Sequence, residues 1–185
     1  GIDFSKNGSK VTVPGNRDFG LSEYKIEPDV SGACYFYAMA PLLRTDVIVK
    51  DVHRNSLQGD IKFVELTEQL GCVLKETEAG LLVKGSHISE FPGLSVNMKD
   101  FSDQTMTMAA IAPFASSETL IQNVGHIRFQ ESDRITAIVT ELNRMGIKCE
   151  EAPQEDGIRI LPISEKDVKA ALVETYDDHR MAMAF

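Results

Sequence analysis

Two long segments of the chain carry the same order of apolar and polar residues. From Asp29, an acidic residue is followed by small and apolar residues, a proline, a short polar turn and the β-branched stretch "DVIVKDV". From Asp103 the same order recurs and ends in "TLIQNV". An acid before a small apolar run predicts a capped helix, and β-branched stretches predict strands. Each segment therefore starts with a helix followed by a strand.

The next part of each segment predicts a second helix and a hairpin. "DIKFVELTEQLG" and "DRITAIVTELNRMG" have the spacing of amphipathic helices, and Gly71 and Gly146 occupy their C-cap positions. Two strand patterns around a turn follow each glycine. Because Pro41 and Pro113 lie 72 residues apart in matching places, the two segments are copies of one unit.

The two ends of the chain look like parts of further copies. "GIDFSKNGSKVTVPG" matches the strand–turn–strand end of the unit, and "DDHRMAMAF" matches its acid-plus-helix start. Asp29, Asp103 and Asp178 are 74 and 75 residues apart. We therefore expect two nearly whole βαβαββ-like units flanked by parts of two more, as in an internal fragment of a longer repeat protein.

Composition narrows the class of protein. The chain has 185 residues, of which 43% are hydrophobic and 25% charged, as expected for a folded core. Its net charge of -9 argues against binding nucleic acid or an anionic membrane, so any anion must be held locally. Three widely spaced cysteines offer no disulfide framework and indicate a reducing compartment. No apolar stretch reaches the roughly 20 residues that span a bilayer.

Two of the predicted helix starts carry polar residues that suit an anion. Asp29, Ser31 and Gly32 open the first helix, where free backbone N–H groups and the positive end of the helix dipole attract negative charge. Asp103 lies at the corresponding start in the second copy. Simple N-capping explains both acids equally well, and spacing alone favours it.

A third helix start is more unusual. Arg128, Glu131 and Arg134 crowd the beginning of the helix that ends at Gly146, and His126 adjoins them. Glu131 and Arg134 are spaced i, i+3 and could simply pair with each other. The alternative is an external anion, because the helix dipole disfavours an arginine in the first turn.

The end of the chain repeats that pattern. His179 and Arg180 fall in the first turn of the last predicted helix, so phosphate or carboxylate ligands are expected at two helix starts. The sequence contains no HxH or HExxH metal spacing and no GxGxxG or Walker sequence. We therefore predict neither a metal nor a cofactor.

Four stretches of the chain carry a family resemblance. "DVSGACYF", "RNSLQGDI", "QESDRI" and "YDDHRMAM", in this order, resemble the 5-enolpyruvylshikimate-3-phosphate synthases, or 3-phosphoshikimate 1-carboxyvinyltransferases. The resemblance runs over essentially the whole chain. It implies an α/β (α+β) fold of repeated βαβαββ units, with helices inside and sheets outside, forming parts of the two lobes of an enolpyruvyl transferase. The implied division is 1–74 for part of the first, shikimate-phosphate-binding lobe and 75–185 for part of the second.

The resemblance also implies a reaction. The family transfers the enolpyruvyl group of phosphoenolpyruvate to the 5-hydroxyl of shikimate 3-phosphate and releases phosphate. Asp103 matches a proposed general base, and Glu131 matches the glutamate proposed to move the methylene proton. Arg134 and Arg180 match arginines that hold phosphoenolpyruvate, and His179 matches the histidine beside them.

The shikimate side of the site departs from the family pattern. Ser31, Gly32 and Tyr35 fall where the family binds the phosphate and ring, but the second of these is usually a serine. The family lysine of "KETDR" is Gln130 here, which removes a positive charge. Either Arg128 or a group outside this chain compensates, or anion affinity is lower.

Two other functions stay open. The chain could be a noncatalytic truncated fragment that only binds anions, or a relative of the UDP-N-acetylglucosamine enolpyruvyl transferases, which share the fold and chemistry. The preferred reading is a cytoplasmic, monomeric transferase of aromatic amino acid biosynthesis. Its partners are then the small molecules shikimate 3-phosphate and phosphoenolpyruvate, with no nucleic acid and no membrane.

Overall fold

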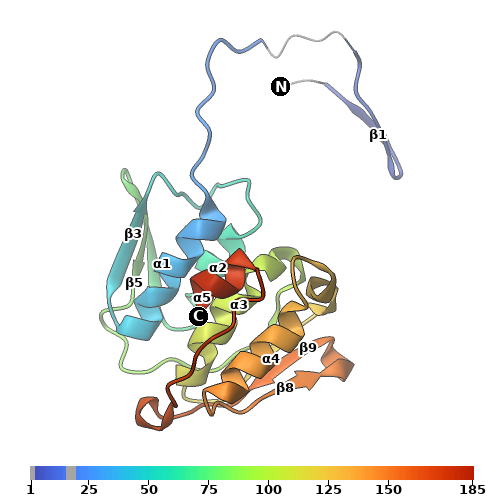
Figure 1. Ribbon diagram of the computed structural model, residues 1–185. Coiled ribbons are helices and arrows are strands. Elements are labelled where there is room, and N and C mark those ends of the chain that lie inside the picture. Colours follow the sequence, from blue (N-terminus) through green and yellow to red (C-terminus); the bar gives the residue numbers. More distant parts are fainter. Residues whose placement is uncertain (1–2, 16–19) are drawn as a thin grey trace.

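Two β-sheets with helices between them form most of the protein (Figure 1). The computed structural model describes residues 3–15 and 20–185. The strands are β1 Ser5–Asn7, β2 Lys10–Thr12, β3 Asp46–Lys50, β4 Val73–Thr77, β5 Gly80–Lys84, β6 Ser95–Asn97, β7 Thr119–Gln122, β8 Cys149–Ala152 and β9 Gly157–Ile160. The α-helices are α1 Val30–Leu43, α2 Ile61–Leu66, α3 Thr105–Ile111, α4 Arg134–Arg144 and α5 His179–Ala184. Short 3₁₀ helices are η1 Lys99–Gln104, η2 Ala112–Phe114, η3 Gly125–Phe129, η4 Pro153–Glu155 and η5 Glu165–Asp167.

The two sheets share one strand order and the same antiparallel pairing, which confirms the repeat. In the first sheet the order is β3-β5-β4, and both pairs are antiparallel. In the second sheet β7, β9 and β8 take the equivalent places, again in antiparallel pairs. The second sheet adds β6, which pairs parallel to β7. The segment from β6 to β9 is thus one complete βαβαββ unit. The segment from α1 to β5 matches this unit but has no counterpart of its first strand, β6.

The helices lie on the inner side of both sheets, as the predicted fold class requires. α1 packs against α3, and α3 also contacts α4 and α5. A single hydrophobic core runs through both units, with its largest fully buried side chains at Tyr37, Phe63, Leu70, Leu81, Met98, Met106, Met108, Ile121, Ile127, Ile135, Ile138 and Leu142. Of these, Ile135, Ile138 and Leu142 belong to the apolar face that the sequence pattern predicted for the helix α4.

Glycines end the second helical segment of each unit, as predicted. Gly71 has a φ of 93° and Gly146 a φ of 81°, a conformation that glycine adopts without steric cost. In the second unit the amide of Ile147 donates to the carbonyl of Leu142 at 2.9 Å, which closes the helix end. The chain then turns into the β8–β9 hairpin.

The first described residues form a hairpin that lies apart from both sheets (Figure 1). β1 pairs antiparallel with β2, and every described residue of the two strands is exposed. This strand–turn–strand is the predicted copy of the unit's end.

The predicted division of the chain after residue 74 falls inside β4. Leu74 and Lys75 both pair with residues of β5, so the first sheet continues across this point to Lys84. The second sheet starts at Ser95. The connection between the sheets therefore lies in residues 85–94, and the assignment of the two sides to separate lobes stays a prediction.

In the described part of the chain the three cysteines, Cys34, Cys72 and Cys149, are free and buried. Burial raises the pKa of Cys72 to about 11 and that of Cys149 to about 12. Among the described helices, none combines the length and apolar character needed to cross a membrane.

Candidate active site

The start of α4 brings Arg134 into the protein interior. Asp133 caps the helix by accepting hydrogen bonds from the backbone amide of Thr136, at 3.0 Å, and from its hydroxyl, at 2.8 Å. Behind this cap, Ile135 and Ile138 are buried in the core. The capped first turn and the buried apolar face therefore fix the direction in which Arg134 points.

Arg134 forms a two-point ion pair with Asp178, which lies 44 residues later at the start of α5. Its Nε lies 2.8 Å from Oδ2 and its Nη2 lies 3.3 Å from Oδ1. The arginine side chain is 3% exposed and the aspartate side chain is not exposed at all. A paired guanidinium and carboxylate in this geometry give both strength and a fixed orientation.

Asp178 also caps α5, as predicted from the sequence. Its Oδ1 accepts the backbone amide of Arg180 at 2.9 Å, and its Oδ2 accepts the hydroxyl of Ser132 at 2.9 Å. Burial alone would raise the pKa of this carboxyl group, but the bonds from Arg134, the amide and Ser132 outweigh burial and lower the pKa to about 2. The carboxylate thus stays ionised at neutral pH.

Asp103 joins the two arginines of the site. One carboxylate oxygen lies 3.2 Å from Nη1 of Arg134, and the other lies 2.8 Å from Nη2 of Arg180. Asp103 belongs to η1 and makes no helix cap, because the N-cap of α3 is Gln104. N-capping, the alternative explanation from the sequence, therefore does not account for Asp103.

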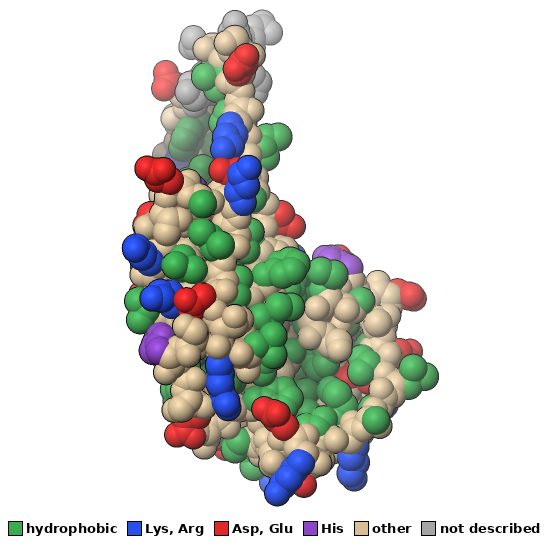
Figure 2. All heavy atoms as spheres, turned by 90° about the vertical axis from the view of Figure 1, so that its left-hand side faces the viewer, with side chains coloured by type: hydrophobic (Ala, Val, Ile, Leu, Met, Phe, Trp, Pro, Cys, Tyr) green, Lys and Arg blue, Asp and Glu red, His purple; other side chains and the backbone are tan. Residues whose placement is uncertain are grey.

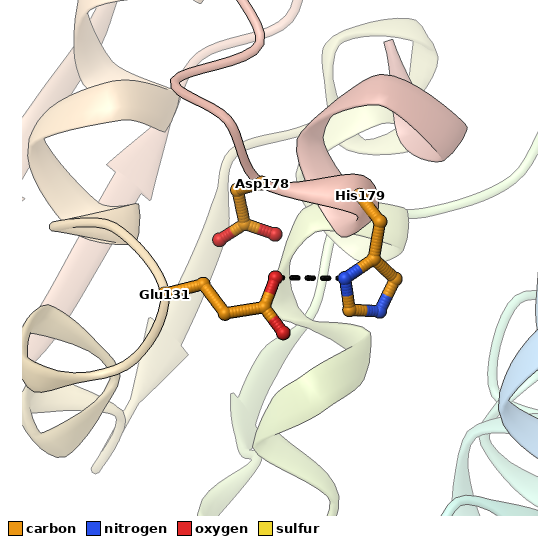
Figure 3. A group of neighbouring side chains, drawn as sticks. All are labelled: Glu131, Asp178 and His179. Carbon is orange, nitrogen blue, oxygen red and sulfur yellow. Dashed lines mark hydrogen bonds and ion pairs between the residues drawn. The ribbon is translucent and has the colours of Figure 1, made fainter.

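Glu131 and His179 form a second pair at the edge of the site (Figure 3). Nδ1 of His179 lies 2.7 Å from Oε2 of Glu131, and both side chains are about half exposed, at 61% and 49%. Glu131 lies 4.0 Å from Arg134, so the i, i+3 pairing considered from the sequence is at most a weak contact. The carboxylate and the imidazole are thus placed to exchange a proton with a molecule bound beside them.

Three groups of this site lie close enough to hold a metal ion together. Ligand atoms of Glu131, Asp178 and His179 lie within 4.8 Å of one another (Figure 3). However, both oxygens of Asp178 already accept hydrogen bonds from Arg134, so a cation there would face a guanidinium. The donor set therefore fits an ion-pair network better than a metal centre.

The neighbouring positions 130 and 128 have different surroundings. The side-chain oxygen of Gln130 accepts a hydrogen bond from Nη1 of Arg134. Arg128 instead points to Asp133, at 3.2 Å, and also bonds Glu151. Arg128 is therefore paired with two carboxylates, while Arg134 is the arginine that contacts position 130.

The residues predicted for the shikimate side lie on the first turns of α1. The Ser31 hydroxyl donates to Oδ2 of Asp60, which also accepts the side-chain amide of Gln104 at 2.7 Å. A Cβ atom at Gly32 would lie 3.1 Å from Oδ2 of Asp29, so a serine at this position would require a small shift of that exposed side chain.

Tyr35 connects α1 with the arginines. Burial raises the pKa of Tyr35, while the Arg180 guanidinium beside it acts in the opposite direction. His126 lies in η3, where its Nε2 is 2.8 Å from the hydroxyl of Ser102, one residue before Asp103. Tyr35 therefore borders the arginine cluster, whereas His126 contacts the residue that precedes Asp103.

The structure thus brings most predicted site residues to one place. The converging residues are Asp103, Gln130, Glu131, Arg134, His179 and Arg180, with Tyr35 beside them. Sequence reasoning missed Asp178 and Ser132 as members of this network, and it missed Asp60 and Gln104 as the group bonded to Ser31. The paired acids of "DDHR" were the available signal for Asp178; the others carry no local signal, because their partners are distant in sequence.

Comparison with known proteins assigns the chain to a family. The profile of EPSP synthase (3-phosphoshikimate 1-carboxyvinyltransferase) matches residues 1–185. A 3-phosphoshikimate 1-carboxyvinyltransferase of Nostoc punctiforme is 43% identical over 177 residues, which are 96% of this chain and 40% of that protein. The chloroplastic 3-phosphoshikimate 1-carboxyvinyltransferase of Arabidopsis thaliana is 40% identical over 98% of this chain and 34% of its own length.

A solved structure agrees with these relatives. The EPSP synthase from Acinetobacter baumannii superposes with a TM-score of 0.81 and 25% sequence identity, over 100% of this chain and 44% of that chain. This chain therefore spans less than half the length of the relatives that it matches. The repeat, the ion-pair network and the match over every residue lead to one conclusion: the chain belongs to the EPSP synthase (3-phosphoshikimate 1-carboxyvinyltransferase) family.

Proposed function

We propose that this chain supplies part of the active site of a 3-phosphoshikimate 1-carboxyvinyltransferase. The reaction transfers the enolpyruvyl group of phosphoenolpyruvate to the 5-hydroxyl of shikimate 3-phosphate and releases phosphate. The observation that carries the proposal is Asp103 held between Arg134 and Arg180, with the pair Glu131 and His179 alongside. Both substrates are anions, and planar guanidinium groups bind carboxylate and phosphate at two points.

Each group has a role in this proposal. Asp103 accepts the proton of the 5-hydroxyl as that oxygen attacks phosphoenolpyruvate. Glu131 gives a proton to the methylene carbon and takes one back when phosphate leaves, and His179 orients its carboxylate. Arg180 and the Nη1 edge of Arg134 hold phosphoenolpyruvate, while Ser31, Gly32 and Tyr35 face shikimate 3-phosphate. His126 and Gln130 border the same site.

We further propose that the rest of a longer protein covers the open side of these helices. The hollow between α1, α3 and α5 is lined mainly by apolar side chains, among them Met39, Leu42 and Met183. Met39 is 40% exposed and Met183 is 56% exposed. Hydrophobic side chains also gather around the hollowed middle of the face drawn in Figure 2. Relatives more than twice as long as this chain would have enough residues to cover such a surface.

The division into lobes belongs to the same proposal. One sheet ends at Lys84 and the next begins at Ser95, which supports a boundary in residues 85–94, later than the predicted position after residue 74. The full-length enzyme would then be a cytoplasmic monomer whose cleft lies between the lobes. Its molar mass in solution, measured by light scattering, tests the monomer.

Phosphate release is the direct test of the activity. We expect the full-length protein to release phosphate only when both phosphoenolpyruvate and shikimate 3-phosphate are present, and the isolated 185-residue chain to release none that is measurable. Turnover requires a preorganised set of groups, and this chain holds only part of it. Release with UDP-N-acetylglucosamine instead would assign the other branch of enolpyruvyl transferases. Binding without release in the full-length protein would favour the noncatalytic alternative.

A further inference from the structure

The segment between β9 and α5 lies along α4 and leads to Asp178. The amide of Lys169 donates to the carbonyl of Met145 at 2.9 Å, and Arg144 donates to the carbonyl of Leu172 at 2.9 Å. The segment therefore follows α4 from its C-terminal end back toward its first turn. Between Lys169 and Asp178 no described residue is fully buried, so hydrogen bonds supply much of what holds this stretch in place.

Glu141 is the main anchor for this segment. Its side chain is completely buried on α4. One oxygen accepts the hydroxyl of Tyr176 at 2.7 Å, and the other accepts the backbone amide of Glu174 at 3.3 Å and Nη1 of Arg144 at 3.0 Å. A buried carboxylate with partners on both oxygens is strongly tied to them, since an unpaired charge there would be costly.

The backbone next to this anchor is strained. Tyr176 has a φ of 58° and Asp177 a φ of 54°, a region that bulky side chains rarely occupy. Such a conformation persists only where surrounding contacts hold it. Those contacts are the hydroxyl bond from Tyr176 to Glu141, the packing of the Tyr176 ring against the core, and the turn hydrogen bond from the amide of Asp178 to the carbonyl of Thr175 at 2.9 Å.

We propose that Glu141 and Tyr176 form a positioning clamp for the site. The clamp keeps the two residues before Asp178 in the left-handed conformation. This conformation directs the next three residues so that Asp178 meets Arg134, Arg180 meets Asp103 and His179 meets Glu131. Neither clamp residue is among the proposed substrate-binding groups; both act through the start of α5.

Tyr176→Phe and Glu141→Gln test the clamp in the full-length protein. The first variant removes one hydroxyl and keeps the ring, so it should fold. We expect deuterium exchange at the amides of residues 177–182 to become about tenfold faster, the effect of losing one hydrogen bond to a charged group. Exchange within α4, residues 134–144, should stay unchanged. Asp177→Asn is the matched control, because asparagine tolerates the same backbone conformation and leaves Glu141 untouched.

Steady-state kinetics give the second readout, which rests on the proposed function. We expect kcat/KM for phosphoenolpyruvate to fall about tenfold in Tyr176→Phe and by less in Glu141→Gln, because the glutamine oxygen can still accept the hydroxyl of Tyr176. Unchanged exchange in both single variants would overturn the clamp, and so would equal acceleration throughout α4, which indicates general destabilisation. If the wild-type protein shows no transferase activity, the proposed function fails and the exchange result alone decides the clamp.

Discussion

Arg134 and Asp178 form a buried two-point ion pair that ties the first turn of α4 to the first turn of α5. From the sequence, one explanation for Arg134 at a helix start was that it binds an external anion. In the structure Asp178 and Asp103 already supply negative charge to this arginine. The pair uses Nε and Nη2 of Arg134, so Nη1 is the nitrogen that bonds Asp103 and Gln130. A substrate anion that binds Nη1 would compete with these two side chains.

Replacing Asp178 by Asn should strongly destabilise the protein. Asparagine keeps the helix cap but leaves the buried Arg134 without its main partner, so we expect a loss of about 3 kcal/mol in the free energy of unfolding at pH 7. Urea unfolding of the wild type and the variant measures this difference. Asp177→Asn, in the same turn, should change stability much less.

The same variant should also alter the pH dependence of stability. The pKa of Asp178 is about 2 in the folded protein, below its ordinary value of 3.8. A lowered folded-state pKa stabilises the protein above pH 3.8, and the stabilisation disappears as the pH falls toward 2. This contribution is roughly 2 kcal/mol, so the gap between wild type and Asp178→Asn should shrink between pH 5 and about pH 3. A constant gap over that range would contradict the assignment.

Asp103→Asn and Glu131→Gln separate proton transfer from structure. If these acids move protons, each amide should lower kcat about 100-fold or more while substrate still binds. If they serve only as ion-pair partners of Arg180 and His179, the melting temperature should fall and turnover should stay near normal. Kinetics and thermal melts of the full-length variants distinguish the two outcomes.

Gln130→Lys should tighten phosphoenolpyruvate binding. The substitution restores a positive charge next to Arg134, and the structure shows that Arg128 is already paired with Asp133 and Glu151. Titration calorimetry should show a several-fold lower Kd, and Gln130→Glu should shift the Kd in the opposite direction. Weaker binding by the lysine variant, with the fold intact, would mean that Gln130 itself makes a required contact.

Asp60 should stabilise the junction between the two units. Its carboxylate joins Ser31 on α1 to Gln104 before α3, and both bonds go to one oxygen. Asp60→Ala would leave the buried Gln104 amide unpaired and should cost about 2 kcal/mol, whereas Asp60→Asn can keep the accepting oxygen and should cost less. Urea unfolding measures both. Asp100→Ala removes an exposed carboxylate nearby and should have little effect.

The repeat, the amphipathic helix α4 and the glycine caps were determined by the sequence alone. Apolar spacing identified α4, Asp178 caps the last helix as predicted, and Gly71 and Gly146 end the helical segments as predicted. These features depend on residues within a few positions of one another. The sequence can predict these features because helix faces, caps and turns depend on residues that are close together in the chain.

The identity of each charged partner was decided only by the tertiary structure. Arg134 pairs with an acid 44 residues later, Glu131 with a histidine 48 residues later, and Ser31 with an acid 29 residues later. The sequence placed Arg128 and Glu131 at the same helix start but could not tell which of them faces the other elements. That choice depends on how three helix starts pack around one point, since burial makes an unpaired charge costly and each charged group takes the partner that packing supplies.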